Sequence, residues 1–479
     1  MLSASDTISF LNFTRLWKFG VLILIYCLVV YGMARPASVT PDGWRLTGLF
    51  LATVAGLMLQ PIAGGALVLI AITLLPLLTK TTPQVALAGY ADPTNWLVLA
   101  AFFISRSLIN TGLARRIALG FVRTFGQSSL GISYALTLTD TLLATIIPSN
   151  GARAGGVTLP ICRSIAELYG SKPGTSAALL GTFLMAAVYQ GVCVSSAMFY
   201  TGQASNPLAA KIATEFGGVS VTWLSWFVAA SVPGIASLII VPWLVFKILR
   251  PQVQKTPEAA AFAAKELHAM GAMSTNEKIL TAVFVCVCGL WITTEWHKLD
   301  VAISALLGSA ALLLTGVLTW EDVKSERSAW DIFIWYGGLL QLGKLLNGTG
   351  VTKVFAQQVS GIFDTQNWWL IFLPALLIYF YAHYGFASIT AHLLAMYPAF
   401  LAVLTAKGAP LGLLVYSFAC FANLSAGLTN YGTTPAPMFF AQGYVTFRDW
   451  WRVGFIVSLA NLAIWGTIGF GWWKVLGLW

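Results

Sequence analysis

Mostly apolar runs of membrane-spanning length recur along this chain. About 20 such residues let a helix cross a hydrocarbon core of about 30 Å. Short polar loops separate the runs, and most charged residues lie in those loops. The pattern predicts a bundle of membrane helices that includes residues 19–33, 44–59, 67–78, 96–113, 223–244, 279–294, 301–318, 332–346 and 455–473.

Two further apolar regions differ from these runs because small and polar residues interrupt them. The first region, 137–160, is interrupted at 148–156, and another break follows at 200–207. Such an interruption at membrane depth is tolerated only where the backbone is buried in protein or lines a watery cavity.

The second half of the chain repeats this order of parts. Region 368–400 is interrupted at 388–392, and a break follows at 429–435. The long polar stretch 247–278 separates the halves. Matching interruptions in two halves are typical of inverted-repeat transporters with a binding site near the bilayer midplane.

We therefore predict an all-α polytopic membrane protein with two inverted-topology repeats. It has about 11 transmembrane helices plus two re-entrant hairpins, one in each repeat. The expected parts are scaffold helices in 1–127, the first hairpin and broken helix in 128–222, scaffold helices in 223–367, the second hairpin and broken helix in 368–446, and a final helix in 447–479.

Composition supports a membrane protein and excludes a soluble one. Of the residues, 58% are apolar and 9% charged, whereas about 25% are charged in soluble domains. The formal net charge of +10 is spread over short loops, so we expect no nucleic-acid partner. The six cysteines lack metal-type spacing, and we expect neither a metal site nor a cofactor.

Basic residues in short loops stay on the cytoplasmic side of a membrane. The richest clusters are Arg115, Arg116 and Arg123, then the stretch 247–278, then Arg448 and Arg452. Placing all of them inside predicts a cytoplasmic N-terminus and a periplasmic C-terminus in a bacterial inner membrane.

Five stretches carry a family resemblance: GLARRIALGFVRTFG (112–126), PSNGARAGGVTLP (148–160), AMFYTGQASNP (197–207), YAHYGFASITAH (381–392) and GYVTFRDWWRVG (443–454). They resemble the divalent-anion/sodium symporter superfamily, in particular its antiporter branch of citrate/succinate, tartrate/succinate and 2-oxoglutarate/malate exchangers. The resemblance implies secondary active transport of di- or tricarboxylate anions by obligatory exchange, an elevator-type movement and a homodimer in membrane lipid.

The family's pattern places a Ser-Asn-Thr signature at each hairpin tip, where tip hydroxyls and amides help to form sodium sites. Here the first signature reads Ser149-Asn150-Gly151, and the second reads Ala391-His392-Leu393. Several of those oxygens are missing, so sodium coupling is not favoured. The missing side chain at Gly151 leaves room for a larger anion.

Small and polar residues at the interruptions suit an anion, because they expose backbone N–H groups and offer hydroxyls. Arg153 lies in an apolar segment, where an unpaired cation costs at least about 2.5 kcal/mol. We hypothesise that Arg153 and a protonatable His392 take the electrostatic place of sodium. The other expected substrate ligands are Ser149, Asn150, Gly151, Thr201, Gly202, Thr390, Ala391, Thr433, Thr434 and Pro435.

Other interpretations stay open at this point. Arg153 is alternatively a residue that reaches towards the headgroups, His392 and His383 are alternatively structural, and Asp140 is expected to pair with a cation in a scaffold role. A sodium-coupled dicarboxylate symporter is the first alternative function. An intramembrane enzyme using His383 or His392 is a distant one, because neither HExxH nor GxSxG is present.

Overall fold

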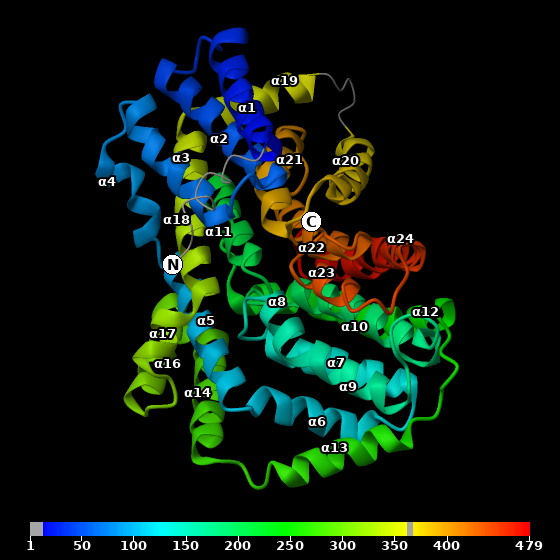
Figure 1. Cartoon of the computed structure of the whole chain (residues 1–479). Helices are drawn as coiled ribbons and strands as arrows, with labels where there is room; N and C mark the ends of the chain where they lie inside the picture. The colour runs from blue at the N-terminus through cyan, green and yellow to red at the C-terminus, as the bar shows by residue number, and fades with distance from the viewer. Residues whose placement is uncertain (1–12, 362–366) are drawn as a thin grey trace.

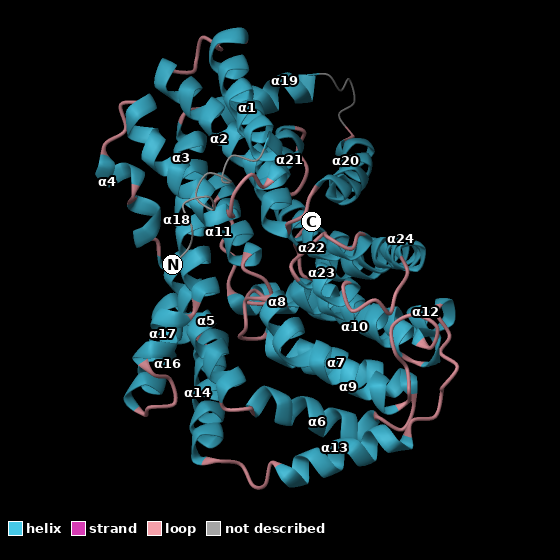
Figure 2. Ribbon diagram, in the orientation of Figure 1, coloured by secondary structure: helices cyan, strands magenta, loops and turns pink. Residues whose placement is uncertain are grey.

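The computed structural model describes residues 13–361 and 367–479. Within those residues the chain is helical and forms no β-strand (Figure 2). Eight of the described helices are long and apolar enough to cross a membrane, or nine if one bent pair is a single span. The predicted all-α membrane class is confirmed.

The first half runs from the N-terminus to a surface helix (Figure 1). Its helices are α1 (Phe13–Cys27), α2 (Pro41–Leu59), α3 (Gly64–Leu78), α4 (Pro83–Ala86), α5 (Pro93–Asn110), α6 (Leu113–Phe125), α7 (Ser129–Ala144), α8 (Asn150–Arg153), α9 (Leu159–Leu168), α10 (Gly181–Met198), α11 (Ser205–Gly217), α12 (Trp223–Ile248) and α13 (Pro257–Ala269).

The second half repeats the order of hairpin, broken helix and long final helix. Its helices are α14 (Thr275–Ile292), α15 (Thr294–His297), α16 (Val301–Leu314), α17 (Trp320–Ser325), α18 (Arg327–Gly348), α19 (Val351–Gly361), α20 (Trp368–Ala382), α21 (Ile389–Ala406), α22 (Leu411–Ser425), α23 (Pro435–Phe440), α24 (Phe447–Ile464) and α25 (Phe470–Val475).

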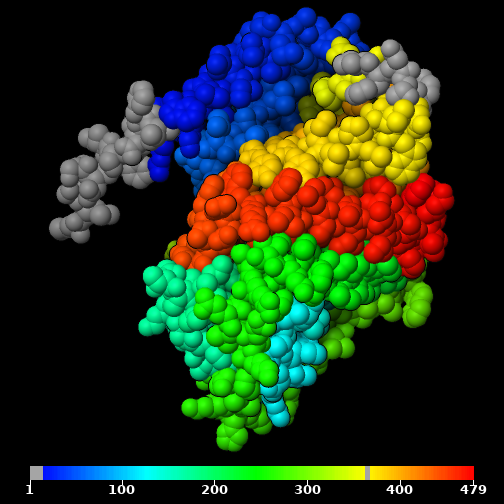
Figure 3. Space-filling model, turned by 90° about the vertical axis from the view of Figure 1, so that its right-hand side faces the viewer, coloured from blue at the N-terminus to red at the C-terminus, as the bar shows by residue number. Residues whose placement is uncertain are grey.

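Helices α2, α3, α5 and α18 pack together, and α16 lies against α5, which gives one scaffold from both halves. In Figure 1, α3, α5, α16 and α18 lie to the left of α10, α22 and α23. On the face shown in Figure 3, the C-terminal segment lies between the second hairpin and the green residues of α12. The core therefore joins segments from both ends of the chain.

The predicted span 96–113 does not continue straight into the next helix. The axes of α5 and α6 differ by 64°, and Gly112 between them has a φ of 80°, which favours glycine. In Figure 1, α6 runs beside α13 at the edge of the molecule. The polar stretch 247–278 is thus ordered and packs on α6.

Backbone hydrogen bonds attach the loop before α13 to the base of the first hairpin. The amide of Ser129 donates to the carbonyl of Gln254 over 3.0 Å, and the amide of Thr256 donates to the carbonyl of Gln127 over 2.9 Å. The loop that joins the two halves is therefore fixed to α7.

Both hairpins turn at a serine that caps the next helix. The Ser149 Oγ accepts from the amide of Ala152 over 3.1 Å, and the Ser388 Oγ accepts from the amide of Ala391 over 3.3 Å. Such caps satisfy a free amide at a helix start. The predicted interruptions 148–156 and 388–392 were too long, because the chain is helical again from Asn150 and from Ile389.

The broken helices cross at the centre of the molecule, where α10 packs on α22. The side-chain amide of Asn423 donates to Asn206 Oδ1 over 2.8 Å, and the Tyr189 hydroxyl donates to the carbonyl of Ala426 over 2.6 Å. These buried polar bonds join the two halves where both helices are interrupted.

Replacing Arg116 by glutamine tests the attachment of α6 to α14. Arg116 Nε donates to Glu277 Oε1 over 2.6 Å, and the Glu277 carboxylate is nearly fully buried. Losing a hydrogen bond to a charged group costs about 1.5–3 kcal/mol, so Arg116→Gln should clearly lower the melting temperature in detergent.

Arg115→Gln is the matched control for this measurement. Arg115 pairs with Glu266, but its side chain is 58% exposed, and exposed pairs contribute about 0–1 kcal/mol. Equal melting temperatures for the two variants would show that the buried pair does not hold α6 in place.

Candidate functional site

All four interruptions meet at one cavity of about 380 Å³. Its lining includes Pro148, Ser149 and Asn150 from the first tip, Gln203 and Ala204 from the first broken helix, Ala387, Ser388, Ile389, Thr390 and Ala391 from the second tip, and Thr433 and Thr434 from the second broken helix. The structure therefore brings together the predicted residues Ser149, Asn150, Thr390, Ala391, Thr433 and Thr434.

The opposite wall of the cavity comes from the scaffold helices and is mostly apolar. Leu57, Phe102, Trp335 and Leu339 line it. Gln60, Ser328 and Asp331 add polar groups from the same side. No lysine or arginine is among the lining residues, so the cavity itself offers hydroxyls, amides and helix starts, beside the carboxylate of Asp331.

The two tips present helix N-termini to this cavity. Ser149 precedes α8 and Ser388 precedes α21. Free amides and the helix dipole make an N-terminus favourable for a negative charge. The cavity thus receives partial positive charge from both halves.

Asn150 connects the first tip to the second broken helix. Its Nδ2 donates to Thr433 Oγ1 over 3.0 Å. A Cβ atom on the adjacent Gly151 would lie 2.8 Å from Thr434 Cγ2. The expectation that Gly151 leaves room for a larger anion is therefore wrong, since Thr434 fills the space beside it.

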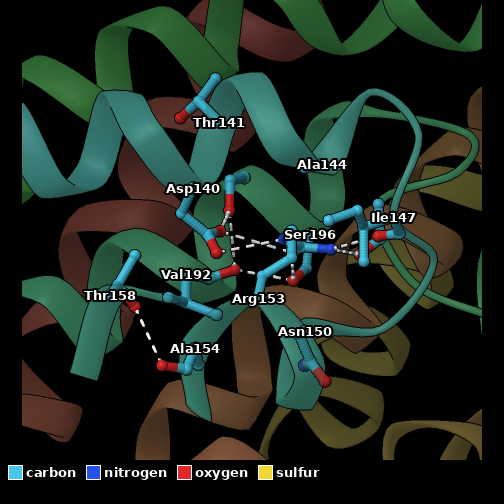
Figure 4. Close-up of polar contacts among 12 residues, drawn as sticks. Asp140, Thr141, Ala144, Ile147, Asn150, Arg153, Ala154, Thr158, Val192 and Ser196 are labelled. Atoms are coloured by element: carbon cyan, nitrogen blue, oxygen red, sulfur yellow. Dashed lines mark hydrogen bonds and ion pairs between the residues drawn. The ribbon is translucent and has the colours of Figure 1, made fainter. Parts of the chain in front are cut away.

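Arg153 is fully buried and bound on all sides (Figure 4). Its Nε lies 3.1 Å from Asp140 Oδ1, and its Nη2 lies 3.3 Å from Asp140 Oδ2. Nη1 donates to the carbonyls of Ile147 and Gly202 over 2.7 Å each, and Nη2 donates to Ser196 Oγ over 3.1 Å. Ser195 Oγ also donates to Asp140.

This geometry changes the expected role of Arg153. The guanidinium does not line the cavity, and in Figure 4 the Asn150 side chain points away from the network around it. Arg153 is neither a direct ligand in this cavity nor a residue that reaches the headgroups. The predicted pairing of Asp140 with a cation is confirmed, and that cation is Arg153.

His392 is the counterpart of Arg153 in the second half. Each follows its capping serine by four positions, and the position of Asp140 corresponds to Tyr379, whose ring centroid lies 4.3 Å from that of His392. The predicted signature 391–393 was therefore out of register, because the tip begins at Ser388.

Two contacts link His392 to the second broken helix through His383. His392 Nδ1 lies 3.0 Å from His383 Nδ1, and His383 Nε2 lies 2.9 Å from the carbonyl of Gly432. His392 is buried outside the cavity lining, and its Nε2 has no partner among the described residues. The matching contact in the first half is the direct bond from Arg153 to Gly202.

Three other predicted ligands lie behind the cavity. The hydroxyl of Thr201 donates to the carbonyls of Ala144 and Thr145, and Gly202 offers its carbonyl to Arg153. Pro435 occupies the first turn of α23. They hold the breaks in place and do not line the cavity.

The sequence prediction missed several lining residues. Gln203 and Ser388 lie inside predicted interruptions, so their positions carried a usable signal. Gln60 and Asp331 lie on scaffold helices, and only the packing of distant segments brings them to the cavity.

Comparisons with known proteins give the family. The model described as "Sodium:sulfate symporter transmembrane region" matches residues 13–479. A putative malate transporter of Bacillus subtilis is 42% identical over 94% of this chain and 95% of its own. A chloroplastic dicarboxylate transporter 1 of Arabidopsis thaliana is 41% identical over 94% of this chain and 82% of its own.

The structure of the YdaH transporter of Alcanivorax borkumensis is similar in fold. The TM-score is 0.52 and the sequence identity 14%, over 97% of this chain and 98% of that one. The predicted recognition as a transporter rather than an enzyme is confirmed. The chain belongs to the sodium:sulfate symporter family of integral membrane transporters.

Proposed function

We propose that this protein is a secondary active transporter of small di- or tricarboxylates and works by exchanging one anion for another. Relatives that are named malate and dicarboxylate transporters support this substrate class. The cavity supports it too, since two helix starts and the side chains of Asn150, Thr433 and Thr434 surround it.

The arrangement of polar groups fits an anion with two carboxylates. Helix N-termini favour negative charge without carrying a formal charge. The two tips face the cavity from different halves of the chain, so each is available to one end of a dicarboxylate.

One observation carries the proposal of exchange without sodium. The Asp140 carboxylate, the carbonyls of Ile147 and Gly202 and the Ser196 hydroxyl form an oxygen set of the kind that binds a hard cation. Here the guanidinium of Arg153 occupies that set. In the second half, the carbonyl of Gly432 is already hydrogen-bonded to His383.

The Asp140 carboxylate changes the hypothesis that Arg153 brings a net positive charge to the site. It neutralises Arg153 formally, so the buried ion pair adds no net positive charge, and the helix starts and side-chain donors at the tips have to attract the anion. In this proposal, the side chains of Arg153 and His383 replace the sodium ion that moves with the substrate in a symporter. The unloaded carrier then keeps unpaired donors at its tips, which disfavours its return without an anion.

The contrast between the cavity walls supports an elevator-type movement. The polar wall belongs to the hairpins and broken helices in 128–222 and 368–446, and the apolar wall belongs to scaffold helices. We propose that the first group slides along the second, in a homodimer within membrane lipid. In the proposed orientation, the N-terminus is cytoplasmic in a bacterial inner membrane, and the C-terminus is periplasmic.

A sodium-coupled dicarboxylate symporter is the second candidate, favoured by the description of the matching family model. Counterflow in proteoliposomes separates the two. We expect uptake of labelled succinate or malate in sodium-free buffer to require unlabelled anion inside. Uptake that needs a sodium gradient and no internal anion would replace exchange with symport.

Asn150→Ala tests the central site. The change removes an amide from the cavity and its bond to Thr433, each worth about 0.5–1.5 kcal/mol. We expect exchange to fall roughly tenfold, since 1.4 kcal/mol is a factor of ten, and dicarboxylates to protect less against thermal unfolding. Asn347→Ala, at an exposed position outside the cavity, is the control and should exchange normally.

The buried ion pair is tested by single and double replacement. Arg153→Gln leaves the Asp140 carboxylate buried and unpaired, which costs about 3–5 kcal/mol, so the variant should melt much earlier. Adding Asp140→Asn should restore the melting temperature but not sodium-free exchange. Full recovery of sodium-free exchange in the double variant would limit Arg153 to a structural role.

A further inference from the structure

A second hollow adjoins the central cavity and carries two cations. Its volume is about 540 Å³, and its lining is Arg15, Lys18, Gln60, Pro61, Ile62, Ala63 and Gly64. Gln60, Ile62 and Gly64 line the central cavity as well. The turn between α2 and α3 therefore forms a wall common to both spaces.

The two cations lie beside this turn. Lys18 Nζ donates to the carbonyl of Leu59 over 2.7 Å, which fixes the ammonium group next to Gln60. Arg15 is exposed. No ion pair joins either residue to a carboxylate among the described residues. Both side chains line the hollow, where their positive charges attract an anion.

A carboxylate, that of Asp331, lies on the inner side of the same turn. Asp331 lines the central cavity, and its Oδ1 lies 2.4 Å from where a Cβ on Gly65 would be, so the carboxylate sits against the start of α3. A carboxylate at this place repels an arriving dianion. Two positive charges on the outer side of the same turn offset that repulsion.

We propose that Arg15 and Lys18 form a staging site, which binds a carboxylate anion before it passes the turn at 60–64 into the central cavity. The inference rests on the proposed function, because it takes the transported anion as the ligand. Clefts lined by one sign of charge raise the local concentration of the opposite ion about tenfold or more, and salt screens the effect.

The test is the exchange of labelled succinate by the Arg15→Gln/Lys18→Gln double variant in proteoliposomes. We expect KM to rise roughly three- to tenfold for succinate on the side that holds Arg15 and to stay unchanged on the other side. The maximal rate should stay close to that of the original chain. High ionic strength should raise the KM of the original chain towards that of the variant.

Three controls make the result specific. Lys80→Gln removes an exposed charge beyond the other end of α3, outside both spaces, and should leave KM unchanged. Arg15→Lys/Lys18→Arg keeps both charges and should keep KM, which separates charge from folding. Asp331→Asn in the Arg15→Gln/Lys18→Gln background should bring KM back down, because it removes the repulsion.

The outcomes also separate this proposal from the function on which it rests. If the original chain exchanges no carboxylate, the proposed function fails. If it does exchange but the Arg15→Gln/Lys18→Gln variant keeps its KM, the staging site alone is overturned. A rise that occurs only in vesicles containing phosphatidylglycerol, and not in phosphatidylcholine, would assign the two cations to lipid phosphate and also overturn it.

Discussion

A helix that stops inside a membrane must find partners for its free backbone groups, and this constraint governs the structure. The described chain interrupts its helices at four places inside the bundle, two in each half. Unpaired groups in hydrocarbon cost several kcal/mol each. Packing the four interruptions together lets neighbouring side chains bind the free backbone groups, as the Tyr189 hydroxyl does for the carbonyl of Ala426. The polar groups that stay unpaired surround one cavity. The buried region that tolerates polar groups is therefore also the region where a ligand can bind.

The two halves meet the same constraint with different chemistry. In the first half, a guanidinium binds the carbonyl of the broken helix directly and needs Asp140 as counter-charge. In the second half, two imidazoles span the corresponding distance, and an aromatic ring replaces the acid. One side therefore carries a fixed charge pair, whereas the other carries two imidazoles beside an aromatic ring.

The membrane class, the two interrupted regions and most residues of the polar wall can be predicted from the sequence, because periodicity and glycine or proline breaks are local signals. The predicted helix restarts lie too late, since residues 150–156 look like a loop in the sequence although they are helical. Arg153 was predicted to bind the anion, because the sequence alone does not show that Asp140, thirteen residues earlier, faces it. The apolar wall and Asp331 depend on the packing of segments hundreds of residues apart.

The loop before α13 has a mechanical consequence. Its backbone is bonded to the base of α7 at Gln127 and Ser129, while α13 packs along α6. A shift of the first hairpin would thus pull on the tether that leads into α14, the first scaffold helix of the second half. The first hairpin and the second repeat are therefore joined by a short stretch of backbone, in addition to the packing of the broken helices at the centre.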